Sequence, residues 1–375
     1  MPQTPHPISL IQHFSVIVDP RIERGKEHRL IDVILISLCA MLCGAETFID
    51  FEEFGKAKKD WLGTFLALPN GIPSHDTFGR IFAMIDPNQF SECFRNWTQS
   101  LRTAINGEIV SIDGKTLRRS HDRSKGKKAI HMVSAWAREN GVVLGQVKVD
   151  EKSNEITAIP ELLRTLELAG CIVTIDAMGC QKKIATEICN ADADYVLALK
   201  GNHETIHDEV KTYLEDAQSN SFAKVPFTYF ETVEKEHGRI DTRRYWITGE
   251  INWMADLQKW EGLKSIGMVE SIRDIEGKIT TERRFFLCSI PPDAVTFARA
   301  ARGHWAIENT LHWSLDVSFN EDQCRMRAGY AAQNVALLRH MSINILKADP
   351  KKRGIKGKQK SAAWDLSYLI CLLKF

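Results

Sequence analysis

Ile109-Val-Ser-Ile-Asp113-Gly-Lys115 decides the fold of this chain, because it is a short apolar run that ends on a carboxylate. The same layout returns in Cys171-Ile-Val-Thr-Ile-Asp176. A carboxylate just past a buried strand lies at the edge of a sheet, where a ligand can reach it. Parallel neighbouring strands lie about 4.8 Å apart, so they would bring Asp113 and Asp176 within reach of one metal ion. Mg²⁺ prefers carboxylate oxygens, although each Asp taken alone also fits a turn.

The segments around these two runs alternate between strand and helix patterns. Two further strands are predicted at Ala129–Ala137 and Val142–Val149, and the intervening Glu139-Asn-Gly141 is typical of a hairpin turn. Downstream we expect helix, strand, helix, strand and helix at Ile156–Leu168, Cys171–Ile175, Lys182–Cys189, Tyr195–Leu199 and Glu204–Ala217. A three-stranded antiparallel meander followed by right-handed crossovers is the element order of the ribonuclease H-like fold. The sequence therefore predicts an α/β protein with a ribonuclease H-like catalytic core.

The N-terminal third is predicted to be helical. Leu30–Cys43 is typical of a buried helix and Phe48–Leu66 of a second helix, and Ser74 is a predicted N-cap. The next apolar residues fall on one face, at Phe78, Ile81, Phe82 and Ile85. Two interpretations stay open, a helix-turn-helix that reads a DNA groove and, as the favoured one, a helical cap.

The remaining chain is predicted to be strand-rich and then helical. Strands are expected at Tyr229–Val233, Asp241–Ile247, Ser265–Arg273 and Glu282–Ile290, and helices at Ala294–Ala301, His304–Leu315 and Ala331–Leu346. The predicted domains are a helical N-terminal domain at 1–107, a candidate for DNA-end binding, the first part of the core at 108–220, a β-rich insertion at 221–291, the last part of the core at 292–348, and a basic C-terminal tail and helix at 349–375.

Composition limits the function classes. The net charge is only +1, so the chain as a whole is not basic. Binding to DNA phosphates would therefore depend on local groups of Lys and Arg. Lys351–Lys360 has six Lys or Arg in ten residues and is either such a group or a solvated linker. The cysteines lack metal-site spacing and indicate reduced thiols in a cytoplasmic protein. The longest apolar stretch is too short to span a membrane, so no membrane association is expected.

The segment Arg302–Asp322 concentrates Arg, His, Glu, Asn and Trp. On an α-helix, Glu308, His312 and Asp316 are spaced by four and share a face. One interpretation is an amphipathic helix with Trp305 and Trp313 in the core. The other is a third carboxylate that completes a two-metal site for phosphoryl chemistry, beside an exposed Trp that stacks on a nucleotide.

Several stretches occur in order along nearly the whole chain and carry a family resemblance. They are Gly71–Thr77, Ile112–Arg118, Asp150–Glu161, Thr174–Gln181, Lys200–Asn202, His237–Arg239 and Arg302–Asp322. In these the chain resembles the H-repeat-associated transposases of bacterial insertion sequences, which belong to the DDE transposases. The resemblance implies a ribonuclease H-like core, Mg²⁺ dependence with Mn²⁺ as a substitute, and cutting and joining of the element's own ends.

The resemblance places the catalytic and metal-binding triad on Asp113, Asp176 and Glu308. Related enzymes often have Tyr-x2-Arg-x3-Glu-x6-Lys around the last carboxylate, where this chain has Ala301, His304, Glu308 and Leu315. Asp316, Glu321 and Asp322 stay as lesser candidates for the third ligand, and Arg302, Arg325 or Arg327 for the missing positive charge. The expected DNA contacts are Lys115, Arg302, His304, Trp305, Asn309, His312 and Arg325.

The expected partners are the terminal repeats of the element, target DNA and a second copy of the chain, assembled as a homodimer on the DNA ends. The expected location is the cytoplasm, in association with the nucleoid. Two alternatives remain, an inactive or regulatory DNA-binding relic of a transposase and a stand-alone metal-dependent DNA nuclease.

Overall fold

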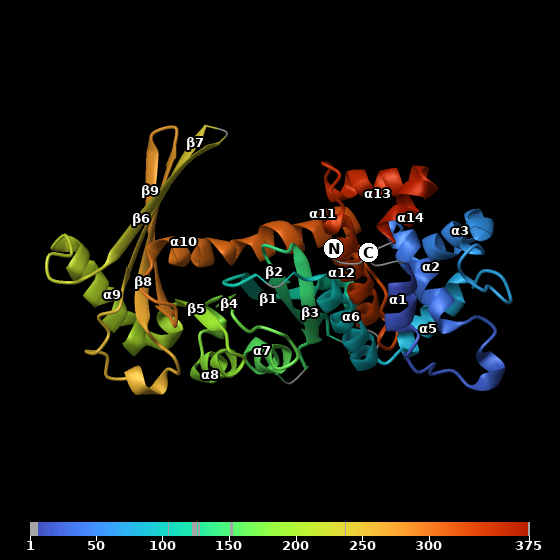
Figure 1. Cartoon of the computed structure of the whole chain (residues 1–375), viewed down its shortest axis with the longest axis horizontal. Helices are drawn as coiled ribbons and strands as arrows, with labels where there is room; N and C mark the ends of the chain where they lie inside the picture. The colour runs from blue at the N-terminus through green and yellow to red at the C-terminus, as the bar shows by residue number, and fades with distance from the viewer. Residues whose placement is uncertain are drawn as a thin grey trace. The chain divides into compact units, whose positions relative to one another are not determined.

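The computed structural model describes residues 7–103, 105–121, 126, 128–150, 153–236 and 238–373. His237 of one family stretch, and Glu151 and Lys152 of another, lie outside the described residues. The chain forms two compact units (Figure 1). The first unit is Met1–Thr103, Gly114–Lys152 and Asn309–Phe375, and the second is Ala104–Asp113 and Ser153–Glu308. Strand β1 (Ile109–Leu117) therefore contributes residues to both.

The first unit is mainly helical. Its described helices of at least four residues are α1 (Pro7–Phe14), α2 (Leu30–Leu42), α3 (Phe48–Ala57), α4 (Lys59–Leu62), α5 (His75–Met84), α6 (Pro87–Leu101), α11 (Trp313–Phe319), α12 (Ala331–Ala348), α13 (Ile355–Trp364) and α14 (Leu366–Leu372). The predicted buried helix is confirmed, because every residue of α2 is buried. α12 is also largely buried and packs against α2, α5 and α6.

The predicted start of α5 is confirmed, because the Ser74 hydroxyl accepts a hydrogen bond from the Thr77 backbone N–H. Phe78, Ile81 and Phe82 on one face of α5 are buried, as the spacing predicts. The single helix predicted over Phe48–Leu66 is wrong. It breaks at Lys58, whose backbone (φ −116°, ψ 19°) leaves the helical region, and α4 then buries Leu62. The solvated-linker interpretation of Lys351–Lys360 is also wrong for its second half, which lies in α13 and buries Lys358.

Strands β2 (Ile130–Ala137) and β3 (Val142–Lys148) form the predicted antiparallel hairpin in the first unit. The strand order there is β3-β2-β1. Asn344 of α12 closes the hairpin from the side, since its side chain accepts from the Val143 N–H and donates to the Val143 carbonyl.

The second unit is a sheet with helices on both faces (Figure 1). Its strand order is β1-β4-β5-β9-β8-β7-β6. β4 (Ile172–Ile175) is parallel to β1 and to β5 (Asp194–Leu199), as the crossover prediction requires. Antiparallel strands then continue the same sheet, namely β9 (Lys278–Cys288), β8 (Ser265–Ile275), β7 (Arg239–Thr248) and β6 (Thr228–Glu236). The predicted β-rich segment thus extends the sheet from β5.

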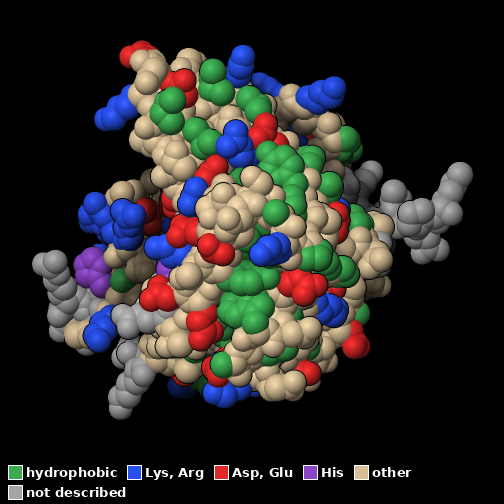
Figure 2. Space-filling view, turned by 90° about the vertical axis from the view of Figure 1, so that its left-hand side faces the viewer, with side chains coloured by type: hydrophobic (Ala, Val, Ile, Leu, Met, Phe, Trp, Pro, Cys, Tyr) green, Lys and Arg blue, Asp and Glu red, His purple; other side chains and the backbone are tan. Residues whose placement is uncertain are grey.

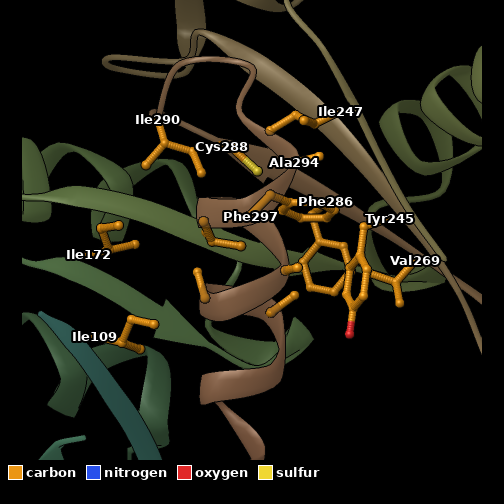
Figure 3. Close-up of a cluster of buried hydrophobic side chains, with 14 residues drawn as sticks. Ile109, Ile172, Tyr245, Ile247, Val269, Phe286, Cys288, Ile290, Ala294 and Phe297 are labelled. Carbon is orange, nitrogen blue, oxygen red and sulfur yellow. The ribbon is translucent and has the colours of Figure 1, made fainter. Parts of the chain in front are cut away.

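Helix α10 (Ala294–Gly303) lies on one face of this sheet, and α7 (Glu155–Leu163) and α8 (Lys182–Asn190) on the other, with α9 (Glu204–Ser219) against β8 and β9. Figure 3 shows the core beneath α10, where Phe297 points onto Phe286 and Tyr245 with ring centroids 5.3 and 6.2 Å apart. Gly267 makes room for this ring, because a Cβ there would lie 2.5 Å from Phe297 Cζ. The aromatic contact fixes α10 on the sheet.

Figure 2 shows one face of the molecule, where Lys and Arg side chains alternate with Asp and Glu side chains. Ion pairs also join the described strands β6–β9, for example Arg244 with Glu231 and Arg283 with Glu270. These arginines are neutralised and do not form a single-sign field that would attract DNA over a distance.

Candidate active site

Asp113 and Asp176 lie at neighbouring positions on parallel strands. Asp113 is the fifth residue of β1, which continues to Leu117, so the prediction that this strand ends at Asp113 is wrong. Asp176 directly follows β4, as predicted. The register of β1 and β4 pairs Ile112 with Ile175, and each aspartate is the next residue. Neighbouring strands lie about 4.8 Å apart, so the two carboxyl groups start from adjacent backbone positions. Both residues are partly exposed, while the strands behind them are buried. The predicted parallel pairing is therefore confirmed.

The Asp176 side chain also shapes the turn that follows β4. Its Oδ1 accepts hydrogen bonds from the backbone N–H groups of Met178 and Gly179, at 3.0 and 3.2 Å. Asn202 steadies the same turn by donating from Nδ2 to the Ala177 carbonyl at 2.9 Å. Burial raises the pKa of the Cys180 thiol to about 12, and the charge of Asp176 acts in the same direction.

A chain of buried hydroxyl groups connects these strands to the end of α10. Thr174 Oγ1 donates to Ser111 Oγ at 3.1 Å, and Ser111 Oγ donates to the Gly303 carbonyl at 3.1 Å. Gly303 is the last residue of α10, and carbonyl groups in the last turn of a helix take partners outside it. The contact holds the start of the segment that carries His304 and Glu308 against the strands that carry the aspartates.

His304 is half-buried, and two of the predicted catalytic carboxylates, Asp176 and Glu308, act on its charge. Burial lowers its pKa, while the charges of Asp176 and Glu308 and a hydrogen bond with the Thr174 backbone act to raise it. Among the described residues, His304 Nδ1 has no hydrogen-bond partner. The phosphate contact expected for His304 from the sequence stays a prediction.

Glu308 is exposed and lies in a π-helix, η7 (Ile307–His312), which is followed by α11. The predicted regular α-helix over His304–Leu315 is wrong, because these six residues have the wider π geometry. The argument that Glu308, His312 and Asp316 share a face therefore fails, since i, i+4 spacing defines a face only on an α-helix. Short π segments are frequent at functional sites.

The aromatic and basic residues near Glu308 have specific partners. The Arg284 guanidinium lies over the Trp305 ring, 4.8 Å from its centroid, and Trp305 is exposed. Arg302 pairs with Glu234 at 2.6 Å. Trp313 is 58% exposed, so the interpretation that put both tryptophans in the core is wrong. Asn309 is exposed.

Lys115 does not present a free charge in this structure. Its Nζ lies 2.7 Å from Asp316, 3.4 Å from Glu321 and 3.2 Å from Asp322, and the side chain is 12% exposed. Burial acts to lower the pKa of Lys115, but these three carboxylates outweigh it and the pKa is raised. The alternative third ligands predicted from the sequence thus all bind this lysine.

Two other expected DNA contacts lie elsewhere in the first unit. Arg325 is exposed at the wall of a cavity of about 660 Å³ that is formed by α3, α5 and residues 320–328. His312 lies near His340, whose pKa is lowered to about 3 first by burial and then by the charges of His312, Arg339 and Lys115. Of the expected phosphate contacts, Lys115 and Arg302 are each held in ion pairs within their own unit.

The pair Asp113 and Asp176 has the donor chemistry for a hard divalent cation, since carboxylate oxygens in adjacent positions suit Mg²⁺. Over the described ranges, no group of three or more His, Cys, Asp or Glu is close enough to hold a metal ion. The pair therefore fits the ion, but Glu308 is not gathered with it in this structure.

Sequence reasoning missed the supporting residues Ser111, Thr174, Asn202 and Arg284. Asn202 belongs to one of the family stretches, which was the available signal. Arg284 had none, because its contact with Trp305 spans 21 residues and depends on how β9 meets the segment after α10.

Comparisons with known proteins found matching family models and similar proteins. A family model described as a transposase DDE domain matches residues 105–345, and a DDE_Tnp_1-associated model matches residues 11–98. The chain is 42% identical over 367 residues to "Putative transposase YncI" of Escherichia coli O157:H7, covering 96% of this chain and 93% of that protein. It is 40% identical over 370 residues to "H repeat-associated putative transposase YhhI" of Escherichia coli strain K12, covering 97% of each.

A solved structure of a piggyBac transposase synaptic complex with hairpin DNA is also similar, at 12% identity and a TM-score of 0.45, covering 98% of this chain and 82% of that one. A likeness at this level has no weight for fold or function. Within the described residues, no helix has both the length and the apolar character needed to cross a membrane.

Proposed function

The chain belongs to the DDE transposase family, and on that premise we propose that Asp113, Asp176 and Glu308 form the site that cuts and joins DNA at the ends of an insertion sequence. Transposases act on DNA, and this family generally uses divalent metal ions. The observation that carries the proposal is the register of β1 and β4, which puts Asp113 and Asp176 side by side.

A ribonuclease H-like core is part of this proposal. The order β3-β2-β1 in the first unit, the order β1-β4-β5 in the second, and the parallel pairing of β1, β4 and β5 all support it. Of the predicted catalytic residues, Asp113 lies within β1, Asp176 directly follows β4, and Glu308 lies on the segment after α10, which packs on the same sheet.

In the proposed mechanism, Asp113 and Asp176 hold the divalent ion, Mg²⁺ or in its place Mn²⁺, and Glu308 approaches from the π-helix. A bound ion would supply activation of the attacking oxygen and stabilisation of the leaving oxygen in a phosphodiester displacement. Asp176 would help to hold the ion while its Oδ1 accepts the turn hydrogen bonds from Met178 and Gly179.

Trp305 is the proposed contact for an unstacked base, with Arg284 on its ring, since aromatic side chains stack on nucleotides of any sequence. We propose that the N-terminal helices bind the DNA end and that two copies assemble on the two ends to be joined. Its DNA substrate places the protein in the cytoplasm, at the nucleoid.

The test is a cleavage-and-joining assay with a duplex that contains the element end, in Mg²⁺ or Mn²⁺. Asp176→Asn keeps an Oδ1 that can accept the turn hydrogen bonds but removes the charge. We expect at least a 10³-fold loss of cleavage, about 4 kcal/mol in the barrier, with DNA binding retained. Asp208→Asn is the matched control, because Asp208 is exposed and lies on α9.

Cleavage by Asp176→Asn at the level of the unmodified chain would overturn the proposal. Cleavage of any duplex without a joined product would instead indicate a stand-alone nuclease. End binding without cleavage by the unmodified chain would indicate a DNA-binding relic.

A further inference from the structure

The Lys115 cluster is a group of charges, partly buried and partly exposed, that the proposed chemistry does not use. Three carboxylates surround the ammonium group, and Glu321, the most enclosed of them, is 2% exposed. Glu321 also pairs with Arg339 at 3.4 Å, and Arg339 is 3% exposed. Asp322 pairs with Arg118 at 3.1 Å. The cluster thus balances three cations with three anions.

This balance disfavours a phosphate contact for Lys115. A lysine that binds DNA exposes its ammonium group and contributes uncompensated positive charge. Here three carboxylates lie 2.7–3.4 Å from Lys115 Nζ and compensate its charge. A phosphate that approached the lysine would also be repelled by Asp316 and Asp322. Breaking a buried ion pair to free the lysine leaves carboxylates without a partner, which is costly.

The position of the cluster along the chain indicates another role. Lys115 follows Asp113 by two residues on β1, so their side chains leave the strand on the same face. Asp316 follows Glu308 by eight residues along the helical segment that includes the π-helix. The chain enters the first unit right after Asp113 and again right after Glu308. One ammonium group therefore joins the strand beyond the first catalytic carboxylate to the helix beyond the third.

We propose that Lys115 is a positioning residue, whose ion pairs with Asp316, Glu321 and Asp322 tie β1 to the helix that follows Glu308 and so limit where Glu308 lies relative to the Asp113–Asp176 pair when a metal ion binds. The proposal rests on the proposed function of that triad. The ion pairs lie directly beyond Asp113 and Glu308 along the chain, so they are a fixed point for both segments. Misplacement of a catalytic group by about 1 Å costs on the order of 10²-fold in rate.

The experiment compares full-length Lys115→Met, Lys115→Arg and Arg118→Met. Arg118 is the matched control, because it pairs with the same cluster but is 78% exposed. Three quantities are measured: cleavage of an end-containing duplex against Mn²⁺ concentration, Mn²⁺ affinity by electron paramagnetic resonance without DNA, and DNA affinity against salt concentration.

For Lys115→Met we expect about 10²-fold less cleavage, weaker Mn²⁺ binding without DNA, and an unchanged salt dependence of DNA binding. Lys115→Arg should recover part of both losses, and Arg118→Met should behave as the unmodified chain. Two results together would overturn the proposal. The slope of log DNA affinity against log salt concentration would be smaller by about 1 in Lys115→Met, as for the loss of one phosphate contact, and its Mn²⁺ affinity would be unchanged.

If Lys115→Met does not fold, Asp316→Asn answers the same question, because Glu321 and Asp322 still hold the lysine. It should weaken Mn²⁺ binding to a smaller extent, and unchanged Mn²⁺ affinity and cleavage would overturn the proposal. Failure of the proposed function is a separate result, since it appears as full cleavage by Asp176→Asn.

Discussion

Gly179 shows at the scale of one residue how the candidate site depends on local space. It lies in the turn that Asp176 holds, and its backbone N–H donates to Asp176 Oδ1. A Cβ at this position would lie 2.1 Å from Ile175 Cγ2 and 3.3 Å from Ile159 Cδ1. The turn can therefore fold back over β4 only without a side chain there.

We expect Gly179→Ala to lower the free energy of unfolding by about 1–3 kcal/mol through overpacking. It should also lower cleavage, because relief of the clash moves the turn that orients Asp176. Urea unfolding and the cleavage assay measure the two effects. Gly201→Ala is the control, since nothing lies within 4 Å of a Cβ at Gly201. Equal free energies of unfolding for the two variants would contradict this prediction, because the turn would then accept a Cβ at position 179.

Helix α10 is the element directly before Glu308, the proposed third carboxylate. Apart from Phe297, the side chains on its buried face are small, and they include Ala294, Ala298, Ala300 and Ala301. Small residues let the helix approach the strands closely, and the single large ring fixes its position over Gly267. The hydrogen bond from Ser111 to the Gly303 carbonyl then fixes its end.

Phe297→Ala tests this role. Removal of a fully buried ring should cost about 3–5 kcal/mol in the free energy of unfolding, and cleavage should fall even where the variant remains folded. Val295→Ala is the matched control on the same helix, because Val295 is 56% exposed. Chemical denaturation and cleavage at a temperature below the unfolding transition are the measurements. A cost below about 1 kcal/mol would contradict the packing account.

At the scale of the whole molecule, buried neutral histidine links stability to pH. His340 is buried on α12, and burial, followed by the charges of His312, Arg339 and Lys115, lowers its pKa to about 3 from 6.5. As the pH falls below 6.5, the unfolded chain takes up a proton that the folded chain does not. Stability is therefore lost between about pH 6.5 and pH 3.

His340→Gln should remove this part of the pH dependence. At pH 5 the histidine lies 1.5 pH units below its unfolded pKa, so its contribution is a loss of about 2 kcal/mol. The difference in unfolding free energy between pH 7.5 and pH 5 should shrink by that amount in the variant. Denaturant titrations at the two pH values measure it, and an identical pH dependence of both proteins would refute the assignment.

The sequence by itself determined the local elements and predicted two of the three proposed site residues. Apolar runs, the Ser74 cap and the Asn140-Gly141 turn specify structure through contacts between near neighbours in the chain, and the structure has these elements close to where they are predicted. Asp113 and Asp176 were predicted as a pair because each follows a short apolar run, which is a local pattern. The sequence did not show that β1 continues past Asp113 to Leu117. Glu308 came from the family resemblance.

Only the tertiary structure decided which charges meet. Lys115 and Asp316 are 201 residues apart, and no pattern in either segment shows that they pair at 2.7 Å. The π-helix at Glu308 and the exposure of Trp313 likewise depend on what the segment packs against. Hydrogen bonds within an element follow from the adjoining residues, whereas the partner of a buried charge depends on how distant segments pack. That packing turned the expected DNA-contacting Lys115 into the centre of an ion-pair cluster.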